Sequence, residues 1–365
     1  MKGCFVTTNQ SKIFAPSKVN IDHQKIEAYL NGEQIFPTTI ELDLTQLCTR
    51  SCPGCPYSAS RKPGLTLQIP FLDRLFSVLG SNTSGIVLSG GEPTIVPHFL
   101  ETVAMARKKG FKEIAVISNG ANIDRPKVQA ALLEHVTSIR ISMYDWQEND
   151  SEFFINTLKK IEGLRNRIEK EGSKLEIGAA ILTRLELNRR YEPVGLQALN
   201  AGIHWLYFHP YCIDWNTEYP TQADQTGVLE AIEKLKEIAP QNANIQVPIE
   251  RYSEKPLYFE KLHGAHFLIQ VGADGINYVG PECKYEKDAE LLNLNNYLED
   301  DFLWHPQRLK RLGKINSDNY RFIGTKHRPP MFSDYIQKLI QLRNDNEAGK
   351  SPIESSSGFF YPSII

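Results

Sequence analysis

From residue 38 to about residue 210, short runs rich in β-branched residues alternate with helical patterns, and this rhythm constrains the fold more than any other feature of the chain. Two neighbouring parallel strands need a long crossover, usually a helix, so the rhythm is typical of consecutive βαβ units. We expect strands at residues 38–44, 85–88, 113–117, 138–143, 175–182 and 204–209. The sequence therefore predicts an α/β protein with a partial (β/α)6 TIM-like barrel and a smaller C-terminal extension.

The segment 99–109, between the second and third predicted strands, has the pattern of a helix. Phe99, Leu100, Val103 and Ala106 recur at the spacing that lines one helical face, and this face should pack on the sheet. The basic run 107–109 suits the negative end of the helix dipole, and Gly110 suits a C-terminal cap. We therefore expect the helix to end there.

The rhythm changes after Pro210, which suggests a division of the chain. Residues 225–238 predict another helix, and residues 267–269 and 275–279 predict a hairpin around Ala273-Asp274-Gly275. The serine-rich end should be poorly ordered. We divide the chain into a lead-in at 1–37, a barrel core at 38–240, an extension at 241–349 and a tail at 350–365.

Bulk properties exclude several classes of protein. The 365 residues are 41% hydrophobic and 23% charged, with a formal net charge of −2. This charge provides no general attraction to nucleic acid or to an anionic membrane, so nucleic acid is not favoured as a partner. No stretch reaches the roughly 18 to 20 apolar residues that span a bilayer, and the first residues lack the apolar core of a secretion signal. We expect a cytoplasmic protein.

Three of the six cysteines, Cys48, Cys52 and Cys55, fall within eight residues directly after the first predicted strand. They should lie on the rim where barrel enzymes carry their chemistry. In a reducing compartment such clustering favours metal binding over disulfides. Three thiolates can hold three irons of a cubane cluster and leave the fourth iron open. Zinc is the alternative, but it needs a fourth ligand, and the nearest following candidate is His98.

The spacing of these cysteines, with three and then two residues between them, resembles the signature of the radical S-adenosylmethionine (radical SAM) superfamily. The resemblance implies a [4Fe-4S] cluster whose open iron binds the amino and carboxylate groups of S-adenosylmethionine. It also implies an external electron donor of the flavodoxin or ferredoxin type, and a 5′-deoxyadenosyl radical that abstracts hydrogen from a substrate.

Two further motifs resemble this family. Gly90-Gly91-Glu92 ends the second strand like the family's glycine-glycine-glutamate motif, which implies that these residues bind the methionyl amine. Glycines permit a close approach of the backbone, and a carboxylate accepts from an ammonium group. Ser118 and Asn119 end the third strand, like a polar motif that is common there in the family.

The later strands supply weaker matches for the same cofactor. Arg140 and Ser142 should point to one face of the fourth strand, where relatives bind the ribose or carboxylate; a polar barrel interior is the alternative. Ile181 matches the apolar adenine-contacting segment. The residue before the third cysteine is usually aromatic in the family, but here it is Gly54, so Tyr57 would supply a face against adenine.

Aromatic and titratable residues follow the sixth strand. Of these, His209, Cys212 and Asp214 are candidates for catalytic proton or hydrogen transfer in a substrate pocket. The alternative is a buried strand end whose histidines are satisfied internally.

The segment 272–284 resembles the start of the SPASM/twitch-like extension that binds an auxiliary cluster in many relatives. Cys283 stands alone there, and the tripeptide 326–328, Lys-His-Arg, stands where further ligands would be expected. One thiolate cannot hold a cubane, so we expect a degenerate extension that lacks the auxiliary cluster ligands and caps the barrel or presents the substrate.

The resemblance leaves the substrate open between a peptide and a small molecule. Relatives with such extensions often modify ribosomally made peptides (RiPP maturation) by epimerisation, crosslinking or splicease-type excision, and this is our first choice. No leader-binding domain is evident in the chain, so a small leader-peptide-binding protein is an expected partner. Radical rearrangement or dehydrogenation of a sugar or nucleoside is the alternative, and a non-catalytic iron-sulfur or zinc protein is a third.

Overall fold

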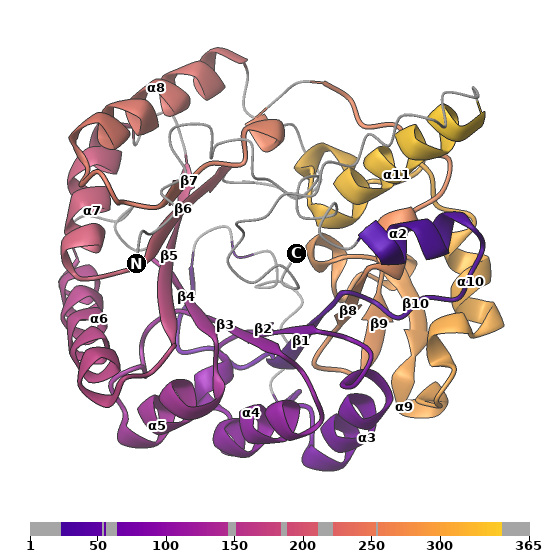
Figure 1. Ribbon diagram of the computed structural model, residues 1–365, viewed down its shortest axis with the longest axis horizontal. Helices are drawn as coiled ribbons and strands as arrows, with labels where there is room; N and C mark the ends of the chain where they lie inside the picture. Colours follow the sequence, from indigo (N-terminus) through magenta and orange to yellow (C-terminus); the bar gives the residue numbers. More distant parts are fainter. Residues whose placement is uncertain are drawn as a thin grey trace.

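The computed structural model describes residues 23–52, 55, 64–144, 151–183, 188–210, 222–252 and 255–344. Its centre is a ten-stranded sheet in the order β10-β9-β8-β1-β2-β3-β4-β5-β6-β7, curved into an open barrel (Figure 1). The six strands of the core are β1 (Thr39–Thr45), β2 (Gly85–Gly90), β3 (Glu113–Ser118), β4 (Ser138–Ser142), β5 (Glu176–Thr183) and β6 (Trp205–Pro210). They are parallel and adjacent in chain order. The predicted strands are confirmed, with ends that differ by at most two residues.

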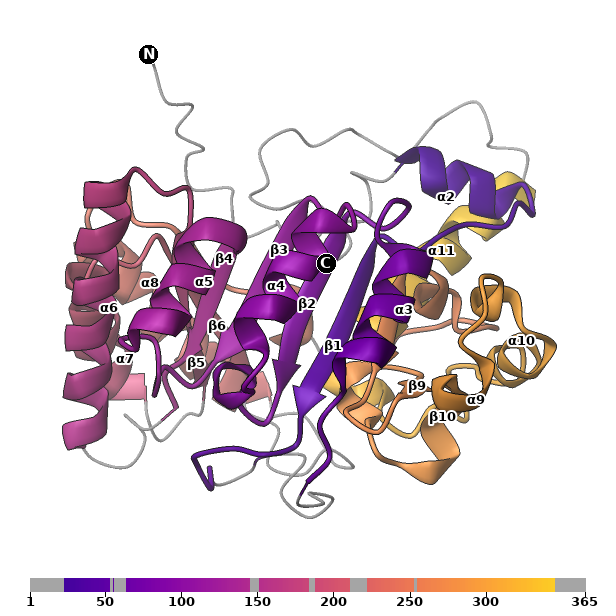
Figure 2. The ribbon, with the colours of Figure 1, turned by 90° about the horizontal axis from the view of Figure 1, so that it is seen from below.

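Helices cover the outer face of this sheet (Figures 1 and 2). They are α3 (Ile69–Leu79), α4 (Phe99–Lys108), α5 (Pro126–His135), α6 (Glu152–Glu171), α7 (Asn188–Asn200) and α8 (Gln222–Ile238). The main hydrophobic core lies between these helices and the strands, where Ile40, Leu42 and Leu44 of β1 are fully buried. Burial of this apolar surface is what holds the helices on the sheet. The fold is thus the predicted partial barrel.

The buried face of helix α4 differs from the prediction at one residue, Leu100. Phe99, Val103 and Ala106 are buried together with Thr102, whereas Leu100 is 41% exposed. Successive helical residues are turned by about 100°. A face that contains Phe99 and Thr102 therefore leaves Leu100 towards solvent.

The C-terminal part adds strands to both edges of the core sheet. The short strand β7 (Ile245–Gln246) lies parallel to β6, and β8 (Leu268–Val271) lies parallel to β1. The strands β8 and β9 (Ile276–Tyr278) form the predicted hairpin, with Gly275 at φ +76° in its turn, and β10 (Glu290–Asn293) follows. One continuous sheet therefore crosses residue 240, and the domain boundary there stays a prediction.

Four helices complete the described chain. They are α2 (His23–Leu30), α9 (Leu294–Tyr297), α10 (Pro306–Leu312) and α11 (Arg328–Asn344). The first lies beside the last, where Ile26 packs in one cluster with Phe267 and Phe332. None of the helices in the described ranges is long and apolar enough to cross a membrane.

Alternate residues of the core strands point into the barrel interior, which we call the lumen. On β1 these are Glu41 and Asp43, and on β6 they include Tyr207 and His209, because the residues between them face the helices. Gly178 of β5 faces the ring of Trp205, which would lie 2.2 Å from a β-carbon at this position. Trp205 thus fills the lumen at the start of β6, and the polar side chains lie nearer the ends of the strands.

Candidate active site

The cysteine loop begins at the carboxyl end of β1. Cys48, Cys52 and Cys55 are half-buried thiols that form no disulfide. Their backbone turns at Cys52, whose carbonyl accepts from the amide of Cys55 at 3.2 Å. No three His, Cys, Asp or Glu side chains of the described ranges lie close enough together to bind one metal ion, and Tyr57 lies outside these ranges. The structure thus places the three thiols on the rim, as predicted.

Gly90 and Gly91 bring the end of β2 against the start of this loop. The amide of Gly91 donates to the Thr45 carbonyl at 2.7 Å, and the amide of Glu92 donates to the Leu47 carbonyl at 2.8 Å. Gly90 has φ +120°, and a β-carbon on Gly91 would lie 2.0 Å from the Leu47 oxygen. Only glycine fits here, because the backbones are too close for a side chain. The close approach is to the residues that precede Cys48.

The Glu92 carboxylate joins the ends of β2 and β3. Its Oε1 accepts from Thr94 N at 3.1 Å, from Thr94 Oγ1 at 2.6 Å and from Ser118 Oγ at 3.0 Å, and its Oε2 accepts from Asn119 N at 2.6 Å. The side chain has no exposed surface. Burial raises the pKa of Glu92, and the hydrogen bonds oppose this effect in part. A carboxylate with these hydrogen bonds holds the ends of β2 and β3 together.

Asn119 extends this network to the cysteines. Its Nδ2 donates to Thr49 Oγ1 at 3.0 Å and lies 3.7 Å from Cys48 Sγ, while its Oδ1 accepts from Ala121 N at 2.9 Å. The amide is therefore held with its donor towards the sulfur. Hydrogen bonds to sulfur are one means by which proteins set the potential of an iron-sulfur cluster.

These residues fit an iron-sulfur cluster with an open iron. Three thiols on one loop are the ligands that such a cluster requires, and Asn119 already donates towards Cys48. The Oε2 atom of Glu92 accepts a single hydrogen bond here, so it retains acceptor capacity for an ammonium group. These side chains therefore fit both cofactors that the sequence implies, the iron-sulfur cluster and S-adenosylmethionine.

The weaker cofactor predictions have mixed outcomes. Arg140 and Ser142 are half-buried on one face of β4, as alternation predicts. The prediction that the Ile181 side chain contacts adenine is wrong. This side chain has no exposed surface and lies in the core on the helix side of β5. The next residue, Leu182, is half-buried on the other face. The apolar pattern alone could not distinguish the two faces, since both are largely buried.

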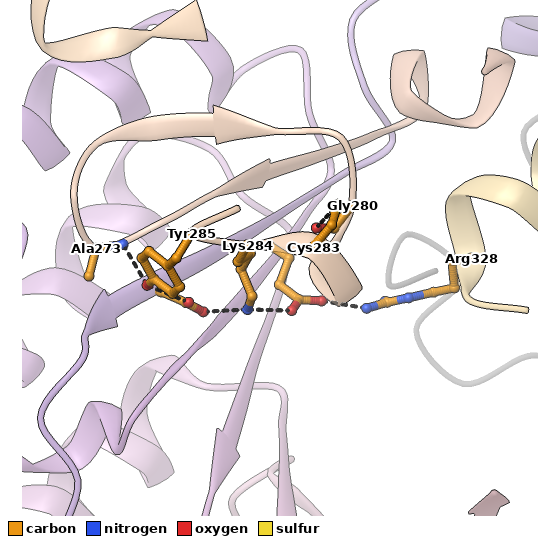
Figure 3. Close-up of polar contacts among 8 residues, drawn as sticks. Ala273, Gly280, Cys283, Lys284, Tyr285 and Arg328 are labelled. Carbon is orange, nitrogen blue, oxygen red and sulfur yellow. Dashed lines mark hydrogen bonds and ion pairs between the residues drawn. The ribbon is translucent and has the colours of Figure 1, made fainter. Parts of the chain in front are cut away.

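A buried ion-pair network, which the sequence reasoning missed, joins the lumen to the extension (Figure 3). Lys284 Nζ lies 2.7 Å from Asp43 Oδ1 and 3.5 Å from Glu41 Oε1, and Arg328 pairs with the other oxygen of Glu41. The Tyr285 hydroxyl donates to Asp43 Oδ2 at 2.8 Å. The signal that could have found it is the acidic pair at alternate positions of a strand, which places two carboxylates on one face.

The pKa values of these carboxylates follow from their partners. Burial would raise the pKa of Glu41, but Arg328, Lys284 and Arg140 outweigh it and lower that pKa. At Asp43 burial prevails over the attraction of Lys284, and the pKa is raised. Glu41 is thus the more firmly ionised of the two.

Cys283 belongs to the hydrophobic core of the extension. Its thiol donates to the Gly280 carbonyl at 3.3 Å, and burial raises its pKa. The neighbouring Glu282 accepts a hydrogen bond from the Tyr320 hydroxyl, and burial raises the Glu282 pKa to about 7. These residues pack the extension rather than face the cysteine loop.

Of the three catalytic candidates, the structure describes His209; Cys212 and Asp214 lie outside the described residues. The His209 ring is half-buried in the lumen, with its centre 5.4 Å from that of Tyr207 and 6.5 Å from that of Tyr144. Burial, together with Arg251 and Arg140, lowers its pKa well below the ordinary value. His209 is therefore neutral at pH 7.

Comparisons with known proteins agree with this geometry. Residues 42–172 match the family model described as the radical SAM superfamily. No curated protein matches the sequence significantly. The structure of Streptococcus suis SuiB bound to S-adenosylmethionine superposes with a TM-score of 0.58 at 14% identity, over 78% of this chain and 70% of SuiB.

The structure of anSMEcpe with bound AdoMet gives the same TM-score of 0.58 at 14% identity, over 87% of this chain and 97% of the other. At such identities the likeness shows the fold. The family match, in contrast, covers the cysteine loop, the Glu92 network and the end of β3. Residues 42–172 therefore carry the fold and the motifs of the radical SAM superfamily, whose enzymes use a [4Fe-4S] cluster and S-adenosylmethionine.

Proposed function

We propose that Cys48, Cys52 and Cys55 hold the cluster and that Gly90, Gly91 and Glu92 hold the methionyl amine of S-adenosylmethionine. The observation that carries this assignment is the unbroken contact from Cys48 through Asn119 to Glu92, and from Glu92 back to the loop at Leu47. When bound and reduced, the cofactors supply a 5′-deoxyadenosyl radical that abstracts hydrogen from the substrate.

The chain's own residues prepare the site. The Glu92 carboxylate fixes the ends of β2 and β3 relative to the cysteine loop, and Ser118 and Asn119 donate to it. Ser142, Arg140 and Tyr57 remain our proposed contacts to the rest of the cofactor. A scaffold of strand ends holds such contacts more precisely than a free loop would.

We assign the substrate to the class of ribosomally made peptides, with His209, Cys212 and Asp214 as candidates for proton or hydrogen transfer. Two structural neighbours support this choice, because SuiB has been captured with its precursor peptide SuiA and anSMEcpe with the Kp18Cys peptide. The neutral His209 ring can accept a proton, although its lowered pKa makes it a weaker base than an exposed histidine. The partners we propose are an electron donor of the flavodoxin or ferredoxin type and a small leader-peptide-binding protein.

The test is mass spectrometry of candidate peptides after anaerobic incubation with reduced enzyme and S-adenosylmethionine. We expect a mass change in the peptide together with 5′-deoxyadenosine, and deuterium transfer from a labelled peptide into that nucleoside. Deuterium transfer from a sugar or nucleoside instead would contradict the peptide assignment while leaving the radical chemistry intact.

A further inference from the structure

Asn119 contacts a proposed ligand of the cluster and a proposed ligand of S-adenosylmethionine through different atoms. We infer that Asn119 is a positioning residue that donates a hydrogen bond to the Cys48 sulfur and thereby raises the reduction potential of the [4Fe-4S] cluster. The inference rests on the proposed function, which assigns Cys48 to the cluster and Glu92 to the methionyl amine. It adds the residue that sets how readily the cluster accepts an electron.

The cysteine loop reaches Asn119 by crossing the end of a neighbouring strand. In the sheet, β2 lies between β1, which leads into the loop, and β3, which ends just before Asn119 (Figure 2). A side chain at Gly91 would collide with the Leu47 carbonyl, since a β-carbon there would lie 2.0 Å from this oxygen. The glycine therefore lets the loop pass close over β2 and brings Cys48 and Thr49 to Asn119.

The orientation of the Asn119 amide follows from its hydrogen bonds. Its Oδ1 accepts from the backbone N–H of Ala121 at 2.9 Å. The reversed orientation would place an NH2 group against that N–H, and two donors cannot bond to each other. Nδ2 therefore faces the loop, where it lies 3.0 Å from Thr49 Oγ1 and 3.7 Å from Cys48 Sγ. The two hydrogens of the NH2 group match these two acceptors.

The backbone around Asn119 is fixed as well. Its N–H donates to Glu92 Oε2 at 2.6 Å, and the N–H of Gly120 donates to Ser118 Oγ at 3.0 Å. Gly120 has φ +80°, a conformation suited to glycine, and a β-carbon there would lie 3.1 Å from Thr157 Cγ2 of helix α6. The amide donor is thus held in place by the protein itself, and a preorganised donor needs no rearrangement when the charge on the sulfur changes.

The effect on the potential has a definite sign. Reduction adds one electron from the external donor to the cluster, no bond is broken, and the added negative charge is shared with the sulfur atoms. An N–H group directed at a sulfur stabilises the form with more negative charge, so the bond to Cys48 favours the reduced form. Asn119 is 8% exposed, and a hydrogen bond that water screens poorly is stronger than one at the surface. Asn119 therefore makes the cluster easier to reduce.

The experiment is a redox titration of the cluster-loaded protein without S-adenosylmethionine, monitored by electron paramagnetic resonance. Asn119→Ser shortens the side chain so that it cannot reach Cys48, while the serine oxygen can still accept from the N–H of Ala121. We expect the equilibrium constant for reduction to fall about 10-fold, which is about 59 mV for a one-electron couple. Asn119→Asp keeps the shape but turns an acceptor oxygen towards the sulfur, so its potential should fall further. An unchanged potential in either variant that retains the cluster would overturn the inference.

The matched control is Asn122→Ser, the same substitution three positions further along the chain. Asn122 is also buried, but its Nδ2 donates to Thr94 Oγ1 at 3.4 Å rather than to a sulfur. Its cluster potential should equal that of the unmodified protein. A shift as large as that of Asn119→Ser would mean that loosening of this segment, and not the bond to Cys48, changes the potential, and the inference would be wrong.

Two further readouts separate this role from others. In the unmodified protein, the resonance Raman bands of the iron–cysteine bonds should shift when N–H is exchanged for N–D, and Asn119→Ser should reduce this shift; equal shifts would contradict the bond to sulfur. Asn119→Ser keeps the backbone bond to Glu92, so weaker S-adenosylmethionine binding with an unchanged potential would assign the side chain to that cofactor and refute the inference. Failure of the unmodified protein to form a cubane would instead refute the proposed function.

Discussion

The two buried carboxylate sites of this enzyme are stabilised in different ways. Glu92, beside the cysteine loop, receives hydrogen bonds from neutral hydroxyl and amide groups that lie within 27 positions of it in sequence. Glu41 and Asp43, on the lumen face of β1, are bound by Lys284 and Arg328, which are 241 to 287 positions away. The first site is built by consecutive βα units, and the second exists only when the extension docks.

The difference indicates separate tasks. Hydrogen bonds from neutral donors favour the charged form of Glu92 and oppose in part the burial that raises its pKa, and the charged form suits contact with a cationic cofactor group. Cationic partners in the lumen instead fix the extension to the strand that leads into the cysteine loop. Tyr285 has φ +68°, a rare backbone conformation for a side-chain-bearing residue, and its hydroxyl is held by Asp43 and by the amide of Ala273. The extension is therefore an integral wall of the barrel.

The largest expected effect comes from Lys284→Met. This change leaves Asp43 buried without its ammonium partner, and loss of one member of a buried ion pair costs about 3–5 kcal/mol. Urea unfolding should show a loss of stability of this size. Lys109→Met is the matched control, because Lys109 lies 2.8 Å from Asp73 but at the surface, where a pair contributes about 1 kcal/mol or less. Equal losses in the two variants would show that burial does not distinguish these pairs.

A smaller effect should follow from pH at Glu282. Its pKa rises from 4.5 to about 7 on folding, so between these values the folded state keeps a proton that the unfolded chain has lost. Stability from this group is therefore full below pH 4.5 and falls as pH rises towards 7, by about 3 kcal/mol. Glu282→Gln should remove this part of the pH dependence of the unfolding free energy. Parallel profiles for the two proteins would refute the shifted pKa.

The smallest of these effects is expected for Glu92→Gln. The amide keeps one acceptor oxygen but turns a donor towards either Asn119 N or the three donors at Oε1, and one buried unsatisfied group costs about 1–3 kcal/mol. We expect this loss in unfolding experiments, with unchanged iron content and weaker S-adenosylmethionine binding. Glu101→Gln, on the first turn of α4, is the control. Unaltered cofactor affinity in Glu92→Gln would remove the residue from the cofactor site.

The sequence was sufficient for the core strands and for the cysteine loop because both depend on local patterns. Buried parallel strands appear as β-branched runs, and the residues that meet at their carboxyl ends follow each run directly. Gly91 illustrates the limit of such reasoning. Its motif was recognised from sequence, yet only the structure showed that the backbone it approaches is that of Leu47.

The rest depended on contacts between distant segments. Nothing in the local pattern of Lys284 or Arg328 indicates a partner on β1, because their ion pairs form only through the docking of the extension. Ile181 was assigned to the wrong face for a related reason, since alternation is hidden in a strand that is apolar on both sides. Long-range charge pairing and strand facing are therefore what the structure adds.

The most direct test of the central claim is chromatographic detection of 5′-deoxyadenosine after anaerobic reconstitution, reduction and addition of S-adenosylmethionine. We expect about four irons per chain, the content of one cubane, and release of the nucleoside, both of which should be lost or strongly reduced in Cys52→Ala. A protein that carries one zinc ion and releases no 5′-deoxyadenosine would contradict the account.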